Sequence, residues 1–319
     1  MSPGGLTAED ATEVCRAYGL GEPTGTMRPV ARGELGRVWR LPTEGGPVAV
    51  KDLFYPPAEA DAAADVAFQF QALAAGVPLP APRLTADGRV LARAPCGATV
   101  RAYEWLDLTP IGQRPIERVG ALLATLHRLA EPTMQPRHPW FVEPVGEPAW
   151  SSLLEDLTRA GAPFAADVAA LLPELLALEA LLPCPRWGDE RRCHLDLDDS
   201  NLARDDRGRL VVLDWENSGP ASPRGELAMV AAEYGPIAAV RLVRTYHAAA
   251  GPAVLREPAD FAVAVAVQGH LIETYARRWL RSGDPAGAED RRRSEWRIAN
   301  FVAQPLTRAR IDGVLAALR

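Results

Sequence analysis

Two carboxylates and one carboxamide bracket a short polar loop and a predicted hairpin. In the segment 194–201, Asp196 and Asn201 stand five residues apart, and an apolar strand further along ends at Asp214. A two-residue turn at 207–208 would set Asn201 beside Asp214. An amide oxygen and a carboxylate held together suit Mg²⁺, which completes its coordination with water and phosphate oxygens. Asp196 would then lie near the phosphate, where a carboxylate orients an attacking hydroxyl, so the pattern indicates phosphoryl transfer.

A single lysine supports this interpretation. The chain has 35 lysine and arginine residues together, and Lys51 is the only lysine among them. It ends the run Val48-Ala49-Val50-Lys51, which is typical of a strand whose lysine reaches the α- and β-phosphates of a nucleotide. The predicted hairpin before this strand holds Gly33 and Gly36, where backbone amides without side-chain obstruction can cover phosphates. Asp and Asn also form loops for local reasons, but their spacing together with Lys51 favours a functional site.

The predicted elements divide the chain into two unequal lobes. A capping box at Thr7 and Asp10 starts a helix that runs to about residue 19, and short strands follow at 27–32, 37–41 and 47–52. A helix is predicted at 58–75, with Ala62, Val66, Phe70 and Leu73 on its core face, and strands return at 79–105. Beyond residue 106 the one strand-like stretch is 201–214, and helices are predicted at 116–129, 150–160, 164–182, 226–250, 259–281 and 290–318.

These elements predict an α+β, bilobal fold. Residues 1–105 form a small antiparallel sheet with one long helix, and residues 106–319 form a larger, mainly helical lobe.

The composition excludes several classes of protein. The formal net charge is −6, and no run of about 20 apolar residues is present, so we expect neither nucleic-acid binding nor a membrane span. The N-terminal residues lack the basic and apolar regions of a secretory signal, which predicts a cytoplasmic protein. The cysteines have no C-x-x-C spacing, so we expect reduced thiols at Cys15, Cys96, Cys184 and Cys193.

Together the motifs resemble those of aminoglycoside phosphotransferases and choline-kinase-type small-molecule kinases, which share a protein-kinase-like fold. The resemblance covers most of the chain. Its most specific part is the pattern H-x-D-x-x-x-x-N from His194 to Asn201, followed by Val212-Leu213-Asp214-Trp215. Further matches are VAVK at Lys51, the helix before Gly76-Val77-Pro78-Leu79-Pro80, the run Leu126-His127-Arg128-Leu129, and Pro223-Arg224-Gly225-Glu226-Leu227-Ala228.

The resemblance implies a role for each motif residue. Asp196 is implied as the catalytic base, Asn201 and Asp214 as the magnesium ligands, and Lys51 as the ligand of the α- and β-phosphates of ATP, with GTP not excluded. The chain from Tyr103 through Glu104 and Trp105 is implied to offer backbone groups to adenine. Residues 1–105 are then the nucleotide-binding lobe, and residues 106–319 hold the catalytic loop and the substrate pocket. The chain has no D-F-G or A-P-E motif, which argues against a protein substrate.

Three positions depart from the family pattern. The residue after the loop histidine is usually Gly or Arg, but here it is Leu195. Asp198 stands where protein kinases place a phosphate-contacting lysine, so that role is excluded here. The resemblance implies an acid that pairs with Lys51, and the 58–75 helix offers Asp61 and Asp65, with Glu59 nearby. Counting back from the glycine after this helix, as the family pattern does, favours Asp65.

The remaining polar residues bear on the acceptor. Asp198, Asp199, Glu216 and Glu273 can line an acidic pocket for a cationic substrate, or they form a solvated acidic surface. The arginines at 277–278 and 291–293 are predicted as solvated helix faces, with an anionic substrate as the alternative. We expect His127 in the core, His194 in a structural role, and Glu226 as a favourable charge at a helix N-terminus.

The leading hypothesis is an ATP- and Mg²⁺-dependent kinase that phosphorylates a hydroxyl of a small molecule, such as an aminoglycoside or a related natural product. Three alternatives stay open. One is a kinase of a primary metabolite such as choline, a sugar or an amino alcohol. Another is a nucleotide-binding pseudokinase, although the lysine, base and metal positions are all present. The last is a metal-dependent hydrolase built on His194, Asp196 and Asp198, which leaves Lys51 unexplained.

Overall fold

Two compact units make up the chain. The computed structural model describes residues 5–112, 114–182, 188–282 and 287–319. The first unit comprises Met1–Arg114 and Asp196–Ser218, and the second comprises Pro115–Leu195 and Gly219–Arg319. The segment that carries Asp196, Asn201 and Asp214 thus packs with the N-terminal sheet. The sequence-based division at residues 105 and 106 placed this segment with the helical lobe, so the two divisions differ there.

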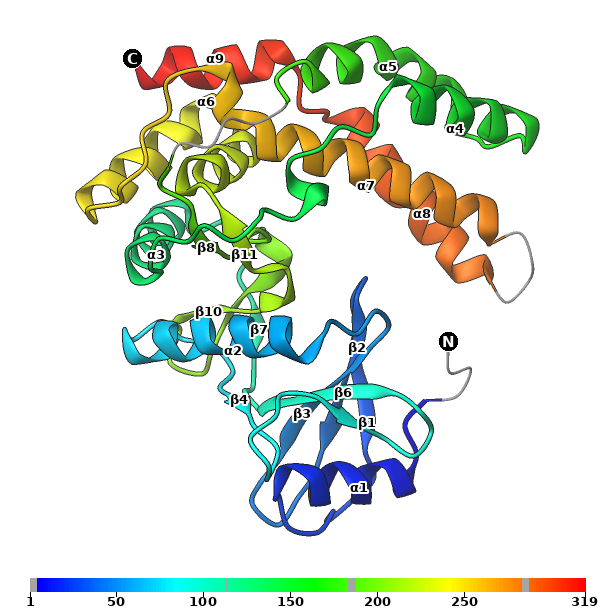
Figure 1. The fold of residues 1–319 in the computed structure, drawn as a ribbon, viewed down its shortest axis with the longest axis vertical. Coiled ribbons are helices and arrows are strands. Elements are labelled where there is room, and N and C mark those ends of the chain that lie inside the picture. The colour runs from blue at the N-terminus through cyan, green and yellow to red at the C-terminus, as the bar shows by residue number, and fades with distance from the viewer. Residues whose placement is uncertain (1–4, 113, 183–187, 283–286) are drawn as a thin grey trace. The chain divides into compact units, whose positions relative to one another are not determined.

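The first unit is built on an antiparallel sheet with the strand order β1-β2-β3-β6-β4. Its main strands are β1 (Arg28–Arg32), β2 (Gly36–Leu41), β3 (Val48–Leu53) and β6 (Thr99–Glu104), with the short strands β4 (Pro82–Arg83) and β5 (Ala92–Arg93) against β6. The helices α1 (Ala8–Tyr18) and α2 (Glu59–Ala74) lie on opposite faces of this sheet (Figure 1).

Strand alternation explains what each face of the sheet holds. Successive side chains of a strand point to opposite faces, so Val50 and Lys51 separate. Val50 joins the apolar core under α1, together with Val100 and Ala102 of β6. Lys51 and its cross-strand partner Arg101 occupy the other face, and Arg101 contacts α2 through Asp65. One face of the sheet is therefore an apolar core, and the other carries buried charge.

The face of α2 that is buried differs from the predicted one. Ala62 and Val66 are buried as expected, but Phe68 is buried and Phe70 is exposed. Asp65 and Gln69 are also buried, and Gln69 Nε2 donates to Asp65 Oδ1 at 2.9 Å. The predicted apolar stripe was wrong at Phe70, because this buried polar pair occupies part of the helix face turned to the sheet.

A second, three-stranded sheet in the first unit carries the polar loop. It has the order β10-β9-β7, formed by β10 (Leu210–Val212), β9 (Leu202–Arg204) and β7 (Thr109–Pro110). A 3-10 turn at Asp199–Asn201 leads into β9, and another at Trp215–Asn217 follows β10. The edge ring contact of Phe68 with Trp215, at a centroid distance of 5.4 Å, packs α2 against the second turn.

The hairpin register is shifted by one residue from the prediction. Leu210 pairs with Arg204 and Val212 with Leu202, so Leu213 rather than Asp214 stands opposite Asn201. The turn has three residues, because Asp205 accepts from Arg209 N at 2.8 Å and Arg207 N at 3.1 Å. Gly208 adopts φ 71° at the last loop position, as three-residue hairpins require. The predicted two-residue turn was therefore wrong.

The second unit is mainly helical, as the sequence predicts. Its helices are α3 (Ile116–Leu129), α4 (Glu147–Arg159), α5 (Ala165–Glu179), α6 (Pro223–Ala248), α7 (Ala262–Arg281), α8 (Ala288–Ala303) and α9 (Arg308–Leu318). A small sheet pairs β8 (Arg191–Cys193) with β11 (Gly219–Ala221). A core of Trp150, Leu153, Ile272 and Trp279 joins α4 and α7. The single helix predicted at 290–318 is two helices, with Pro305 between them.

The α+β fold with a small antiparallel sheet and a larger helical part is thus confirmed. Cys15, Cys96 and Cys193 are free thiols, as expected, and Cys184 lies outside the described residues. In the parts of the chain that the structure describes, no helix is long and apolar enough to cross a membrane.

Candidate active site

The polar loop is shaped by an aspartate that caps its own turn. The Asp198 carboxylate accepts from Ser200 N at 2.7 Å, from Ser200 Oγ at 2.5 Å and from Asn201 N at 3.1 Å. Such a cap satisfies the amides at the start of a 3-10 turn and fixes the next residues. Asp198 therefore sets the backbone at Asn201, which is a different use from the substrate contact considered for it from the sequence.

Asn201 joins the loop to the hairpin through both of its ends. Its side-chain Nδ2 donates to the main-chain oxygen of Asp196 at 2.8 Å, and its own main-chain oxygen accepts from Leu213 N at 2.8 Å. Because the nitrogen of the carboxamide is committed, its oxygen is the atom that Asn201 can present to a cation. Asp214 follows Leu213 directly, with φ 58°. A non-glycine residue rarely takes this left-handed conformation, and such strain is concentrated at functional sites.

Lys51 forms its ion pairs with the segment after β10. Its Nζ donates to Asp214 Oδ1 at 2.6 Å and lies 3.0 Å from Glu216 Oε2. Burial alone would lower the pKa of Lys51, but Glu216 and Asp214 outweigh this effect and hold the pKa above its ordinary value. The expected pairing of Lys51 with Asp65 is wrong.

Asp65 instead neutralises an arginine that the sequence analysis overlooked. Arg101 Nη2 donates to both carboxylate oxygens of Asp65, at 2.7 and 2.9 Å, and the two side chains are 1% and 5% exposed. Arg101 Nη1 also lies 3.4 Å from Glu216 Oε1, and Tyr103 Oη donates to the same oxygen at 3.3 Å. Glu216 therefore bridges the Lys51 and Arg101 pairs. Its place in the sequence gave no sign of this role, because its partners lie on distant strands.

Buried acids at this site have strongly shifted pKa values. Burial raises the pKa of Asp196 to about 7, and the Asp198 carboxylate acts in the same direction, against hydrogen bonds from Asn217 and Asn201. Burial and the facing Glu216 carboxyl raise the pKa of Asp214 well above its ordinary value. A carboxyl group with a pKa near neutrality, such as that of Asp196, is suited to accept a proton during a reaction.

The same charges test whether a divalent cation fits. Lys51 and Arg101 face the carboxyl groups of Asp65, Asp214 and Glu216, so the acids of this network outnumber its bases. Burial, and after it the Glu216 carboxyl, raises the pKa of Asp214. A carboxylate and a free carboxamide oxygen are hard oxygen ligands of the kind that Mg²⁺ prefers. The residues present at Asn201 and Asp214 therefore fit Mg²⁺.

The two glycines of the first hairpin differ in what holds them. A Cβ atom at Gly36 would lie 2.4 Å from the main-chain oxygen of Asp52 and 3.4 Å from Lys51 Cε. Any side chain at this position would therefore force β2 away from β3. At Gly33 the nearest atom to such a Cβ is Gly36 O, at 3.8 Å. Gly36 is thus required by the close approach beside Lys51, and Gly33 lies in open space at the turn.

The segment implied in adenine binding is partly committed to the fold. Glu104 N donates to Ala81 O at 2.8 Å, so this amide already has a partner. The Tyr103 hydroxyl is bonded to Glu216, and Trp105 Nε1 donates to Asp107 Oδ1 at 2.9 Å. The Tyr103 side chain therefore belongs to the charged network.

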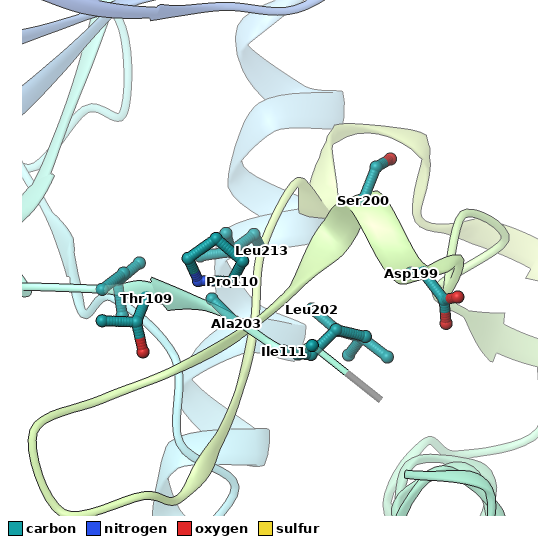
Figure 2. Close-up of a pocket in the computed structure, with 10 residues that line it drawn as sticks. Thr109, Pro110, Ile111, Asp199, Ser200, Leu202, Ala203 and Leu213 are labelled. Atoms are coloured by element: carbon teal, nitrogen blue, oxygen red, sulfur yellow. The ribbon is translucent and has the colours of Figure 1, made fainter. Parts of the chain in front are cut away.

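A hollow of about 460 Å³ lies between the 108–112 segment and the β9–β10 hairpin. Figure 2 shows Pro110 of β7 next to Leu213, with Ala203 and Leu202 of β9 along the same wall. Asp199 and Ser200 of the capped turn also line it. Leu202 directly follows Asn201 and Leu213 directly precedes Asp214 in the chain, but neither Asn201 nor Asp214 itself lines the hollow.

The four acids considered for a cationic substrate all have partners in their own unit. Asp198 caps its turn, and Glu216 is part of the charged network. Asp199 forms an ion pair with Arg114. Glu273 lies on α7 in the second unit, where Arg277 Nε donates to it at 2.8 Å and His270 Nδ1 lies 3.6 Å away.

A buried cluster in the second unit holds the residue before the base. Leu195 N donates to Glu226 Oε1 at 2.6 Å, and Leu195 has φ 64°. His127 Nε2 donates to Glu226 Oε2, and Tyr246 Oη can donate to His127 Nδ1, both at 2.8 Å. Glu226 lies in the first turn of α6, as expected, and its fully buried carboxylate also accepts the bonds from Leu195 and His127. The placement of His127 in the core is confirmed.

The chain resembles a known family and several solved structures. Residues 26–262 match the model of the phosphotransferase enzyme family. Comparison with curated proteins gives no match. A spectinomycin phosphotransferase, solved with ADP and spectinomycin, aligns with a TM-score of 0.68 and 13% identity over 98% of this chain and 99% of its own.

Two further solved structures have the same fold. An aminoglycoside phosphotransferase from Alicyclobacillus acidocaldarius aligns with a TM-score of 0.55 and 15% identity over 95% of this chain and 94% of its own. A thermostable mutant of another aminoglycoside phosphotransferase, solved with ADP and hygromycin B, has a TM-score of 0.53 and 15% identity over 92% of this chain and 99% of its own. The resemblance drawn from the motifs is therefore confirmed. The chain belongs to the phosphotransferase enzyme family and is a phosphotransferase of the kinase type.

Proposed function

We propose that this protein transfers the γ-phosphate of ATP to a hydroxyl group of a small molecule, with Mg²⁺ held by Asn201 and Asp214 and with Asp196 as the base. One observation carries the proposal. Within a single unit, Asn201 is bonded to Asp196, and Asp214 is bonded to the only lysine of the chain. A base, two oxygen ligands and a phosphate-binding cation are the parts that phosphoryl transfer requires.

Each residue has a defined task in the proposed reaction. Asp196 accepts the proton of the acceptor hydroxyl as the oxygen attacks the γ-phosphorus, and its pKa of about 7 suits proton transfer near neutrality. Lys51 holds the α- and β-phosphates as a fixed positive charge. Glu216 and Arg101 keep the Lys51 side chain in place. Bound Mg²⁺ would neutralise charge on the phosphate oxygens.

The adenine of ATP is proposed to face the backbone from Tyr103 to Trp105. The hollow lined by Leu108, Leu202 and Leu213 begins three residues further along the chain and is proposed to receive the ribose. Gly33 and Gly36 are proposed to cover the phosphates with backbone amides, for which the Gly33 amide would exchange its bond to Gly36 O.

An aminoglycoside or a related natural product is the first acceptor class to test. The spectinomycin and hygromycin B structures support this choice by their shared fold. Asp198, Asp199, Glu216 and Glu273 already have internal partners, so recognition of a cationic acceptor by these four acids would require breaking existing ion pairs or caps. Neutral polyols and amino alcohols therefore belong in the same panel.

The proposal is tested by ADP release from ATP and Mg²⁺ over a panel of aminoglycosides, other hydroxylated antibiotics, choline and simple sugars. We expect at least one acceptor to raise ADP release above the rate with water alone, and EDTA to abolish it. Calorimetric titration with the nonhydrolysable analogue AMP-PNP and Mg²⁺ gives an independent readout. The absence of Mg²⁺-dependent nucleotide binding would contradict the proposal.

A further inference from the structure

The carboxylate of Asp196 is held by a residue that no motif identified. Asn217 Nδ2 donates to Asp196 Oδ2 at 2.9 Å. Asn201 Nδ2 donates to the main-chain oxygen of Asp196 at 2.8 Å, and the Asn201 side chain also acts on the Asp196 carboxyl. Two carboxamides, one from each 3-10 turn, thus hold the base.

We infer that Asn217 is a positioning residue for the base, because its bond to Oδ2 fixes the orientation in which the Asp196 carboxylate meets the acceptor hydroxyl. This inference rests on the proposed function. A hydrogen bond to one carboxylate oxygen restricts rotation of the whole group, and proton abstraction depends on the orientation of the accepting oxygen.

The segment that carries Asn217 is well anchored. Trp215, at the start of the same turn, is 3% exposed, and its Nε1 donates to Val212 O at 3.3 Å. Its ring packs edge-on against Phe68 of α2, and Ser218 N donates to Trp215 O at 2.9 Å. The turn begins directly after Asp214. Asp214, the proposed magnesium ligand, and Asn217 are therefore three positions apart on one anchored segment.

A carboxamide has the right chemistry for this position. A lysine or arginine at the same distance would hold the carboxylate equally well, but its positive charge would stabilise the ionised form and weaken the base. The Asn217 carboxamide donates a hydrogen bond, carries no charge and does not titrate near neutral pH. It can therefore orient Asp196 without competing for the proton that Asp196 accepts.

Two substitutions at one position separate positioning from packing. Asn217→Leu keeps nearly the same shape and removes the donor, whereas Asn217→Gln keeps the donor on a longer arm. We expect Asn217→Leu to lower kcat for ADP release by about 10- to 100-fold, because misplaced catalytic groups cost about that much. The KM for ATP, the affinity for AMP-PNP with Mg²⁺ and the Tm should stay near the values of the unsubstituted protein. Asn217→Gln should recover part of the lost kcat.

The same assay is run on the unsubstituted protein and on Asp196→Ala, with the acceptor found in the panel. If Asp196→Ala is inactive but Asn217→Leu keeps its full kcat, the inference on Asn217 is wrong and the proposed function stands. If Asn217→Leu lowers the affinity for AMP-PNP by as large a factor as it lowers kcat, or clearly lowers the Tm, Asn217 has a structural role and the inference is also wrong. If the unsubstituted protein shows no ADP release with any acceptor, the proposed function fails, and this inference fails with it.

Discussion

Lys51 and Arg101 stand opposite each other on β3 and β6, yet each is neutralised by a carboxylate from a different part of the chain. Lys51 takes Asp214, which follows the hairpin of the polar loop, and Arg101 takes Asp65 on α2. Glu216 touches both cations and joins the two pairs. The helix α2 is therefore tied to the sheet through Arg101. Lys51, the proposed phosphate ligand, is held by Asp214 and Glu216, of which Asp214 is a proposed magnesium ligand.

This division predicts different outcomes for the two acids. Asp65→Asn weakens a fully buried ion pair, so we expect a loss of about 2–4 kcal/mol in the free energy of unfolding, with the affinity for AMP-PNP little changed. Glu216→Gln removes the negative charge that faces Lys51 and holds its side chain in place. We therefore expect the affinity for AMP-PNP and kcat to fall by about tenfold or more. Urea unfolding and calorimetry on both variants measure the two effects. A loss of nucleotide affinity in Asp65→Asn as large as that in Glu216→Gln would contradict this division.

The two hairpin glycines form a matched pair. Gly36→Ala would force a methyl group against Asp52 O, so we expect it to cost about 1–3 kcal/mol of stability and to displace β2 beside Lys51. Gly33→Ala meets no atom closer than 3.8 Å and should change stability by less than about 0.5 kcal/mol. Thermal unfolding of the two variants, with and without AMP-PNP, compares them directly. Equal destabilisation by both substitutions would show that the close approach at Gly36 is not the constraint.

The raised pKa of Asp196 predicts opposite pH dependence for activity and stability. The base acts in its ionised form, so kcat should fall as the pH is lowered through about 7. The folded protein binds the proton of the Asp196 carboxyl more tightly than the unfolded chain does. The contribution of this proton to the free energy of unfolding is therefore complete below the ordinary pKa of aspartate and is lost as the pH rises through about 7.

The substitution Asp196→Asn isolates this effect. It removes the cost of a buried charge, so we expect a gain of about 1–3 kcal/mol in the free energy of unfolding at pH 8, since one pKa unit corresponds to about 1.4 kcal/mol. At pH 4 the variant and the unsubstituted protein should be nearly equal. Urea unfolding of both proteins at both pH values measures the difference in their free energies of unfolding. A difference that favours the unsubstituted protein at pH 8 would contradict this prediction.

The buried Glu226 cluster gives a prediction for the second unit. Although burial favours its protonated form, the bonds from His127 and Leu195 hold the pKa of Glu226 below its ordinary value. Glu226→Ala leaves both donors buried without this acceptor, so we expect a loss of about 3–5 kcal/mol in the free energy of unfolding. Glu226→Gln keeps one acceptor oxygen and should cost less. Chemical denaturation orders the two variants, and a Gln variant as unstable as the Ala variant would argue against hydrogen bonding as the main contribution of Glu226.

The sequence predicted elements well where local patterns decide them. The capping box at Thr7, the helix α3 and the strand that carries Lys51 follow from periodicity and from caps, which act over a few residues. The hairpin register could not be predicted from turn residues alone. It depends on the Asp205 side chain, which accepts from two loop amides and thereby selects the longer turn.

The partners of the charged residues were the least predictable part of the site. Lys51, Asp196, Asn201 and Asp214 could be proposed as site residues because each lies in a short motif that is visible in the sequence. The pairing of Asp65 with Arg101, the bridge at Glu216 and the bond from Asn217 to Asp196 each join residues at least 21 positions apart. Only the folded sheet brings these side chains together, and a buried aspartate on a helix looks in sequence like an exposed one.

The most direct test of the central claim separates turnover from nucleotide binding at Asp196. We predict that Asp196→Asn lowers kcat for phosphoryl transfer by about 10²- to 10⁴-fold, the range for loss of a general base, while the Kd for AMP-PNP with Mg²⁺ stays within about threefold. Lys51→Ala is the matched control, and it should weaken nucleotide binding itself. An Asp196→Asn variant that transfers phosphate at the unsubstituted rate would contradict the assignment of Asp196 as the base.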